Sequence, residues 1–360
     1  MDKTLIRVDN LAVPGGSNKS SVSKVICNID FDEDGKQFGS FQVPATRNTS
    51  AWGRIVVPMI QIKNGDGPTF LMTGGLHGDE YEGPVALSKL VQRLKPEQIH
   101  GRVIIIPAVN LPAHYASTRL SPSDNLDMNR SFPGEKHGTS TKVITHFLEQ
   151  VVLPKCDYVL DIHSGGKSLD FVSSVVFHRV EDKEQQKKIF SAARDFGAPY
   201  GILIEETDSD VTFDTAAESR GKIFLSTELR GAGSVNRLAV EIADNGIRNL
   251  LKHIGMADVR PSKYTSYRSK KTQILVSTPD EKCFIVSSED GLLEFVVDLG
   301  DEVKEGQTIA QVHFISNLSR RPKVLKASID GILICKRAPG RVESGDCIGV
   351  IGVEQSWEDL

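Results

Sequence analysis

The sequence predicts an α/β fold, a mixed sheet with helices on both of its faces, followed by a smaller all-β domain. Between residues 25 and 255, apolar runs of strand length alternate with amphipathic stretches, and this alternation is typical of a sheet layered between helices. Beyond residue 273, short β-type runs and turns replace that pattern. The apolar runs expected to form buried strands cover residues 70–73, 103–106, 158–162, 174–177 and 223–227.

Three amphipathic stretches are expected to form helices. The first follows Pro84, a residue suited to the first turn of a helix, and has apolar residues at positions 87, 90, 91 and 94. The second covers residues 143–152, where apolar positions repeat at i, i+4 and i+8 and therefore fall on one face. The third covers residues 236–253, with Gly255 as its expected C-cap.

Composition divides the chain into four segments. Residues 1–24 are polar and form an N-terminal lead-in, and residues 25–255 form the α/β domain, which holds the candidate functional residues. Residues 256–273 are basic, rich in serine and interrupted by Pro261, as expected of a linker. Residues 274–360 form the β-domain.

The β-domain contains an internal repeat. The pattern GLL at 291–293, followed by VKEG at 303–306, returns as GIL at 331–333 and VESG at 342–345. Two half-barrels related in this way resemble the biotinyl/lipoyl-type barrel. In that fold the modified lysine lies in a short hairpin between the halves, whereas the junction here, residues 313–327, is long. We therefore expect a structural or oligomerising domain rather than a carrier.

Composition and charge exclude several classes of function. The net charge of −4 over 360 residues argues against a general nucleic-acid binder. No apolar run approaches the roughly 20 residues that span a bilayer, and the N-terminus lacks the pattern of a secretory signal. The five cysteines are scattered without a CxxC pair, which is typical of reduced cysteines in the cytoplasm. We expect a cytoplasmic protein that binds neither nucleic acid nor membrane. Its oligomeric state stays open, a homo-oligomer included.

The most informative motif is GGLHGDE at residues 74–80, where a strand-like run stops at two glycines and His77 and Glu80 follow. This spacing lets an imidazole and a carboxylate converge on one metal ion, although HxxE alone is common. A second histidine, His163, ends the run at 158–162. Two histidines and a glutamate are a recurrent ligand set of catalytic zinc. The alternative is a turn histidine beside a solvated carboxylate.

Two further carboxylates have candidate roles. Asp161 precedes His163 by two residues, so on a strand both side chains would share a face, and Asp161 could fix the imidazole ring from outside the metal site. A strand-end residue without a metal role is the alternative. Glu228 ends the run at 223–227. A carboxylate there could take a proton from water and deliver it to a leaving nitrogen; the alternative is an ion pair with Arg230.

Candidate substrate-binding residues lie between these elements. Asn129 and Arg130 are adjacent within DMNRSFPG, and a guanidinium beside an amide suits recognition of a carboxylate. Arg119 is a second cation of the same loop. It could polarise a carbonyl where negative charge develops; the alternative is a surface salt bridge worth at most about 1 kcal/mol.

Taken together, the motifs HGDE, DMNRSFPG, DIHSGG and TEL resemble the succinylglutamate desuccinylase/aspartoacylase family, which is related to the zinc carboxypeptidases. The resemblance covers residues 45–255 and implies a zinc carboxypeptidase-like sheet. It also implies one zinc ion per chain, held by His77, Glu80 and His163. Among the other residues it implies that Asn129 and Arg130 bind the substrate carboxylate, Arg119 polarises the scissile carbonyl and Glu228 activates water.

The longer motifs around these residues, GDEYEGP at 78–84 and DIHSGGK at 161–167, are similar to those of the branch of the family that deacetylates N-α-acetyl-L-2,4-diaminobutyrate in ectoine degradation. This resemblance implies hydrolysis of a small N-acyl amino acid. The alternatives are an N-succinylglutamate or N-acetylaspartate deacylase, a carboxypeptidase-like peptidase, and a metal-bound ligand sensor or scaffold. An acidic residue would suit the free ammonium of the diamino acid, and the candidates are Asp127, Glu205 and Glu206.

Overall fold

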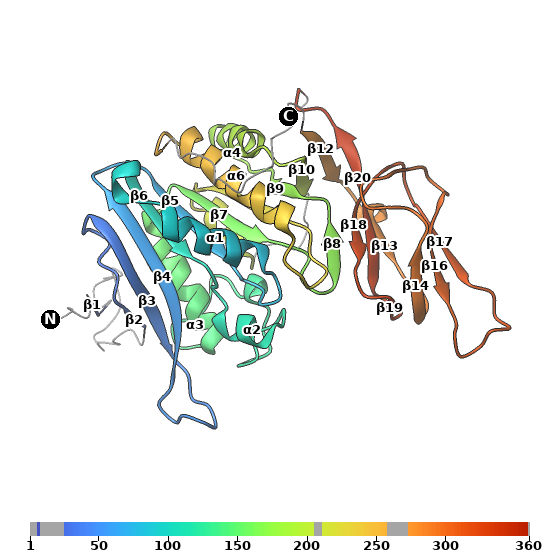
Figure 1. Ribbon diagram of the computed structural model, residues 1–360, viewed down its shortest axis with the longest axis horizontal. Coiled ribbons are helices and arrows are strands. Elements are labelled where there is room, and N and C mark those ends of the chain that lie inside the picture. The colour runs from blue at the N-terminus through green and yellow to red at the C-terminus, as the bar shows by residue number, and fades with distance from the viewer. Residues whose placement is uncertain (1–5, 8–24, 205–210, 258–272, 359–360) are drawn as a thin grey trace.

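The computed structural model describes residues 6–7, 25–204, 211–257 and 273–358. It shows one large mixed sheet flanked by helices, with a β-rich C-terminal part at one end of the molecule (Figure 1). This agrees with the predicted mixed α/β architecture. Within the described part of the chain, none of the helices combines the length and apolarity that crossing a bilayer requires.

The large sheet joins strands from the whole chain. Its first eleven strands are β1 (Ile6–Arg7), β2 (Ile26–Cys27), β3 (Gly35–Pro44), β4 (Arg54–Asn64), β5 (Thr69–Gly74), β6 (Gly101–Ile106), β7 (Tyr158–His163), β8 (Leu169–Phe171), β9 (Ser174–His178), β10 (Tyr200–Ile204) and β11 (Ile223–Glu228). At its centre β6, β5, β7 and β11 run parallel in that order. Antiparallel pairs flank them on both sides, β4 with β6 and β9 with β11. All five predicted strands are confirmed within two residues of their ends.

Helices cover both faces of this sheet, as predicted. They are α1 (Glu82–Arg93), α2 (Leu111–Ala116), α3 (Ser140–Phe147), α4 (Lys183–Phe196), α5 (Phe213–Glu218) and α6 (Arg237–His253). Along β5, Phe70 and Met72 join the core that α1, α4 and α6 cover, and Leu71 joins the core beneath α3 and α5. Successive side chains of a strand point to opposite faces, so this segregation defines the two layers.

The predicted helix over residues 143–152 is not continuous. The α-helix α3 ends at Phe147, a π-helical turn follows over Leu148–Val152, and a 3-10 turn over Leu153–Lys155 completes the segment. Other 3-10 turns cover Pro96–Gln98, Met128–Arg130 and Glu281–Cys283. Helix α6 agrees with its prediction except at its end, where Ile254 is the C-cap and Gly255 follows with φ +77.

The C-terminal strands are β12 (Ile274–Thr278), β13 (Phe284–Val286), β14 (Gly291–Phe295), β15 (Glu302–Val303), β16 (Thr308–His313), β17 (Lys323–Lys326), β18 (Gly331–Arg337), β19 (Arg341–Val342) and β20 (Cys347–Gln355). The two copies of the repeat exchange their short middle strands. Within each copy the outer strands pair, β14 with β16 and β18 with β20, while β15 pairs with β18 and β19 with β14. Each half therefore completes the sheet of the other.

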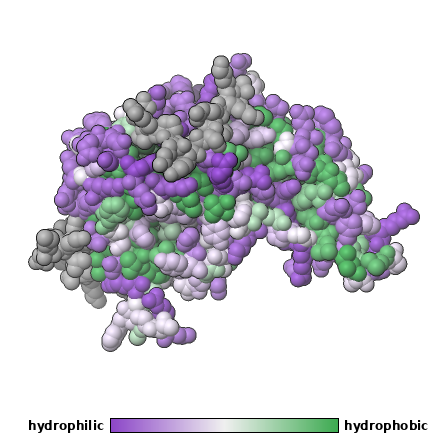
Figure 2. All heavy atoms as spheres, viewed as in Figure 1, coloured by the Kyte–Doolittle hydropathy of each residue, from purple (hydrophilic) through white to green (hydrophobic). Residues whose placement is uncertain are grey.

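The β-rich part is continuous with the large sheet. Strand β12 pairs in parallel with β10, and β20 pairs antiparallel with β12, so backbone hydrogen bonds cross the predicted domain boundary at residue 274. On the face shown in Figure 2, hydrophobic residues gather over this part of the molecule. The structure describes only residues 6–7 of the predicted lead-in. It describes only residues 256, 257 and 273 of the predicted linker. The rest of both segments, with Pro261, lies outside the described residues.

We expect Gly246→Ala to lower the free energy of unfolding by about 1–2 kcal/mol. Alanine gains about 1 kcal/mol over glycine in an exposed helix, but a Cβ at this position of α6 would overlap the ring of Phe196 in α4, and overpacking a core costs typically 1–3 kcal/mol or more. Denaturant unfolding measures the change. A double variant that adds Phe196→Leu should be less destabilised than the sum of the two single variants; a more stable single variant would contradict the packing argument.

Candidate active site

The candidate residues meet where the parallel strands β5, β7 and β11 end. His163 and Glu228 are register partners at the last positions of β7 and β11. His77 and Glu80 lie in the turn between β5 and α1, and Gly75 begins this turn at φ +61. Because the carboxyl ends of parallel strands share one edge of a sheet, residues far apart in the sequence become neighbours there.

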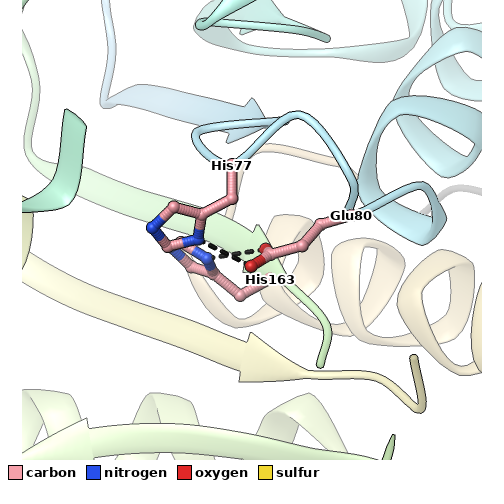
Figure 3. Close-up of side chains that lie close together, drawn as sticks. All are labelled: His77, Glu80 and His163. Carbon is pink, nitrogen blue, oxygen red and sulfur yellow. Dashed lines mark hydrogen bonds and ion pairs between the residues drawn. The ribbon is translucent and has the colours of Figure 1, made fainter. Parts of the chain in front are cut away.

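His77, Glu80 and His163 form a buried cluster (Figure 3). The Glu80 carboxylate faces both rings: His77 Nδ1 is 2.6 Å from Glu80 Oε1, and His163 Nδ1 is 2.8 Å from Glu80 Oε2. One donor atom from each residue lies within 4.8 Å of the other two. Two imidazole nitrogens and a carboxylate match the N and O ligands of zinc. The cluster therefore fits a metal ion in its chemistry and its spacing.

The ring nitrogens that face away from Glu80 are held by other carboxylates. His163 Nε2 is 2.7 Å from Asp161 Oδ2, and Asp161 Oδ1 accepts a hydrogen bond of 2.7 Å from Thr73 Oγ1. His77 Nε2 is 3.1 Å from Asp127 Oδ1. A carboxylate on the outer nitrogen fixes the tautomer and orientation of a metal-binding histidine. Both rings are therefore set to present Nδ1 to the centre of the cluster.

Charge within the cluster keeps its carboxylate ionised. Burial disfavours the charged form of Glu80, but His77 and His163 outweigh burial and hold the pKa of Glu80 well below its usual range. Burial also disfavours a charged His163, yet the carboxylates of Asp161 and Glu80 raise the pKa of this imidazole well above its usual range. An ionised Glu80 can serve as a metal ligand, and binding of a metal ion would displace the protons from the two imidazole nitrogens that face it.

Glu228 lies beside this cluster, and its surroundings favour the protonated form of its carboxyl group. Its side chain lines the same cavity, and Oε2 is buried without a hydrogen bond to any residue that the structure describes. Burial, and then repulsion from Glu80, raises the pKa of Glu228 to about 8. The alternative ion pair with Arg230 is wrong, because Arg230 Nη2 donates to Asp170 Oδ2 at 2.6 Å.

Arg119 contacts the cluster directly. Its Nε is 3.2 Å from Asp127 Oδ2, and its Nη1 lies 3.4 Å from His77 Nδ1 and 3.9 Å from Glu80 Oε1. Asp127 thus binds both His77 and Arg119, so the carboxylate that the sequence offered as an ammonium ligand has partners of opposite charge inside the site. The other two candidates for that role, Glu205 and Glu206, lie outside the described residues.

Asn129 and Arg130 are carried by the 3-10 turn Met128–Arg130 and line the cavity with Arg119. Asn129 Oδ1 accepts a hydrogen bond of 3.0 Å from the backbone N–H of Phe213, which leaves the amide Nδ2 as the donor on this side chain. Arg130 Nη1 donates to the backbone oxygen of Asn129 at 3.0 Å. Three side chains of one loop therefore bring hydrogen-bond donors to the cavity.

Two residues of the HGDE motif have structural roles that sequence reasoning missed. A Cβ on Gly78 would overlap the backbone of Ala113, so only glycine permits this approach to α2. Asp79 Oδ2 accepts a hydrogen bond of 2.9 Å from the backbone N–H of Lys167 and ties the first motif to the third. The nearby carboxylate of Glu82 is directed away from the cluster and accepts a hydrogen bond from the backbone N–H of Asn236 at 3.0 Å.

The cavity has a volume of about 320 Å³ and combines polar and apolar walls. Its lining includes residues that the sequence did not single out as functional, namely Leu169, Phe171, Val176, Thr212 and Asp214. Leu169 and Phe171 are the ends of the short strand β8 and Val176 lies within β9, whereas Thr212 and Asp214 lie at the start of α5. A cavity of this size suits a small molecule rather than a folded polypeptide.

Comparison with known proteins agrees with this geometry. Residues 66–254 match the model of the succinylglutamate desuccinylase/aspartoacylase catalytic domain. Over 338 residues the chain is 42% identical to N-α-acetyl-L-2,4-diaminobutyric acid deacetylase of Halomonas elongata, covering 94% of this chain and 96% of that protein.

Solved structures extend the similarity to the whole fold. The product-bound ectoine utilization protein EutE (DoeB) of Ruegeria pomeroyi superposes with a TM-score of 0.87 at 41% identity, covering 92% of this chain and 99% of that one. An aspartoacylase family protein of Mesorhizobium loti gives a TM-score of 0.79 at 28% identity, with 92% and 98% covered. This chain belongs to the succinylglutamate desuccinylase/aspartoacylase family.

Proposed function

We propose that this protein is a zinc-dependent amidohydrolase that removes the acetyl group from N-α-acetyl-L-2,4-diaminobutyrate. The observation that carries the proposal is the buried set of His77, Glu80 and His163 with Glu228 at its side. The name of the Halomonas relative, at 42% identity over nearly the full length, supports this substrate. We assign one zinc ion per chain to the three-residue set.

The proposed chemistry divides between the metal ion and Glu228. When bound, zinc supplies Lewis acidity, which lowers the pKa of water and polarises a carbonyl oxygen. A cation at the cluster also favours the ionised form of Glu228. Glu228 then takes the proton from the attacking water and returns it to the leaving nitrogen of the amide. Its buried Oε2, without a described hydrogen-bond partner, is the atom suited to hold that proton.

Asn129 and Arg130 bind the α-carboxylate in this proposal. The guanidinium of Arg130 offers paired donors to a carboxylate, and Asn129 adds its Nδ2 because Oδ1 is engaged by Phe213. Arg119, beside the metal-binding set, lies where it can stabilise charge that develops on the acyl oxygen. Holding the carboxylate fixes the acetamide relative to the metal ion and Glu228, and such positioning contributes much of the rate.

We further propose that residues 25–255 form the catalytic domain, 256–273 the linker and 274–360 the β-domain, behind the lead-in of residues 1–24. The exchange of β15 and β19 between the two repeats supports a biotinyl/lipoyl-type barrel. A second hollow of about 830 Å³ supports a role for this domain beside the site, because Arg130 and Glu228 line it together with β-domain residues such as Phe284.

We expect Asp161→Asn to weaken zinc binding by about 10- to 100-fold, the usual effect of losing the carboxylate behind a metal-binding histidine. The amide retains the shape of the side chain but no longer favours the Nδ1-presenting form of His163. Competition with a chromogenic chelator measures the zinc affinity. Asp195→Asn is the matched control, because it alters the exposed pair of Asp195 with His253. Equal affinities in the two variants would contradict the assignment.

Turnover of defined substrates tests the proposed function. The zinc-loaded protein is assayed by amine release with N-α-acetyl-L-2,4-diaminobutyrate, N-acetyl-L-aspartate, N-succinyl-L-glutamate and a peptide with a free C-terminal carboxylate. We expect the largest kcat/KM for the first compound. A larger kcat/KM for one of the others would reassign the substrate, and tight binding of the first compound without hydrolysis would instead indicate a ligand sensor.

A further inference from the structure

We propose that Asp214 binds the distal ammonium group of the substrate and thereby selects diamino acids, an inference that rests on the proposed function. Among the described residues, four carboxylates line the cavity: Glu80, Asp161, Asp214 and Glu228. Glu80 is held between the two histidines, Asp161 holds His163, and Glu228 is the proposed base. Asp214 is the one of these four that the cluster and its chemistry do not use.

The geometry of Asp214 leaves one oxygen for a ligand. Oδ1 accepts a hydrogen bond from the hydroxyl of Thr212 and one of 2.6 Å from the backbone N–H of Thr215, so it is fixed at the start of α5. Oδ2 lies 3.8 Å from His178 Nε2, beyond hydrogen-bonding distance, and the side chain is 14% exposed. A carboxylate held in this way is oriented before a ligand arrives, which reduces the entropic cost of binding.

Asp214 is also tied to the residues that are proposed to bind the α-carboxylate. Phe213, its neighbour in α5, donates its backbone N–H to Asn129 Oδ1 at 3.0 Å. Three residues further along the same loop, Phe132 donates to the backbone oxygen of Val211 at 3.0 Å and its ring stacks on that of Phe213, with centroids 4.8 Å apart. These contacts fix the spacing between the carboxylate-binding loop and Asp214. The loop and the start of α5 can therefore bind one substrate together, the loop at its carboxylate and Asp214 at its ammonium group.

The charges around Asp214 favour a cation. Asp214 also lines an adjoining pocket of about 840 Å³, where Glu181, Asp182 and Glu218 contribute carboxylates and Arg179 and His178 contribute the basic groups. Glu218 Oε1 lies 3.4 Å from His178 Nδ1, so this imidazole is flanked by a carboxylate on each side. Arg119 and Arg130 bring positive charge to the cavity from the loop. The cavity thus has an anionic and a cationic set of side chains, which complements a zwitterionic substrate.

A pair of substrates that differ in one group tests this proposal. N-acetyl-L-norvaline has a methyl group where N-α-acetyl-L-2,4-diaminobutyrate has its ammonium group, and the carboxylate and acetamide are the same. We expect the zinc-loaded wild-type protein to prefer the diamino compound. Asp214→Asn should lower the ratio of the two kcat/KM values by about 10- to 100-fold, the effect expected when a hydrogen bond to a charged group loses its charge. Asparagine retains Oδ1 and its bonds to the start of α5.

The ratio also serves as an internal control, because both substrates are measured on one preparation and any unfolded fraction cancels. Asp214→Glu keeps the charge and should retain more of the preference than Asp214→Asn. Asp195→Asn, which removes an exposed carboxylate that lines neither pocket, should leave the ratio unchanged. An unchanged ratio in Asp214→Asn would overturn the inference while the proposed function stands. A wild-type protein that hydrolyses neither compound would overturn the proposed function, and the inference with it.

Discussion

Glu228→Gln is expected to lower kcat by about 10²–10⁴-fold, the range that a positioned general base contributes, while the protein still binds one zinc ion per chain. The amide cannot accept the proton from water. It does not disturb the proposed ligands, because Glu228 lies beside the cluster on the neighbouring strand β11 and is not one of its three members. Steady-state kinetics and metal analysis of the same preparation measure both effects.

The fold of this variant should be intact. Burial already disfavours the charged form of Glu228 and raises its pKa to about 8. Glutamine has nearly the same shape and is always neutral, so the substitution should not lower the free energy of unfolding. Thermal melting checks this. A variant that retains most of its kcat would exclude Glu228 as the base, and a variant that loses zinc along with activity would place it among the metal ligands instead.

Removal of the metal ion is expected to abolish activity, with kcat/KM lowered by about 10³-fold or more, because a catalytic metal supplies several kcal/mol of transition-state stabilisation. Dialysis against a chelator, followed by one equivalent of zinc, should restore turnover in the wild-type protein. Zinc should also raise the melting temperature, since a ligand that binds only the native state stabilises it.

His163→Ala separates loss of a ligand from general damage. This variant removes one of the three proposed donors, so one equivalent of zinc should restore neither its turnover nor its melting temperature to the wild-type level. The Asp195→Asn variant, changed at an exposed His–Asp pair, should respond to zinc as the wild type does. Full activity of the chelated wild-type protein, confirmed free of metal, would exclude a metal-dependent mechanism.

Much of the fold could be predicted because its signals are local. The strands of the central sheet are apolar runs, and α1 and α6 have apolar residues on one face, so the sequence indicates each element by itself. The break in the predicted helix after Phe147 could not be foreseen, because the same apolar stripe continues through the π-helical turn. Likewise, the repeat indicated two similar halves, but the exchange of β15 and β19 depends on contacts between them.

The positions of the candidate metal ligands and of the proposed base could be predicted from local patterns. His77, Glu80, His163 and Glu228 each follow or end an apolar run, and parallel strands bring such positions to one edge of a sheet. The partners of the surrounding charges could not be predicted in this way. In the folded chain Asp127 contacts His77 and Arg119, Arg230 pairs with Asp170, and Asp214 lines the cavity. Side-chain pairing between distant segments depends on how helices and loops pack against one another, and a local periodicity in the sequence carries no information on that packing.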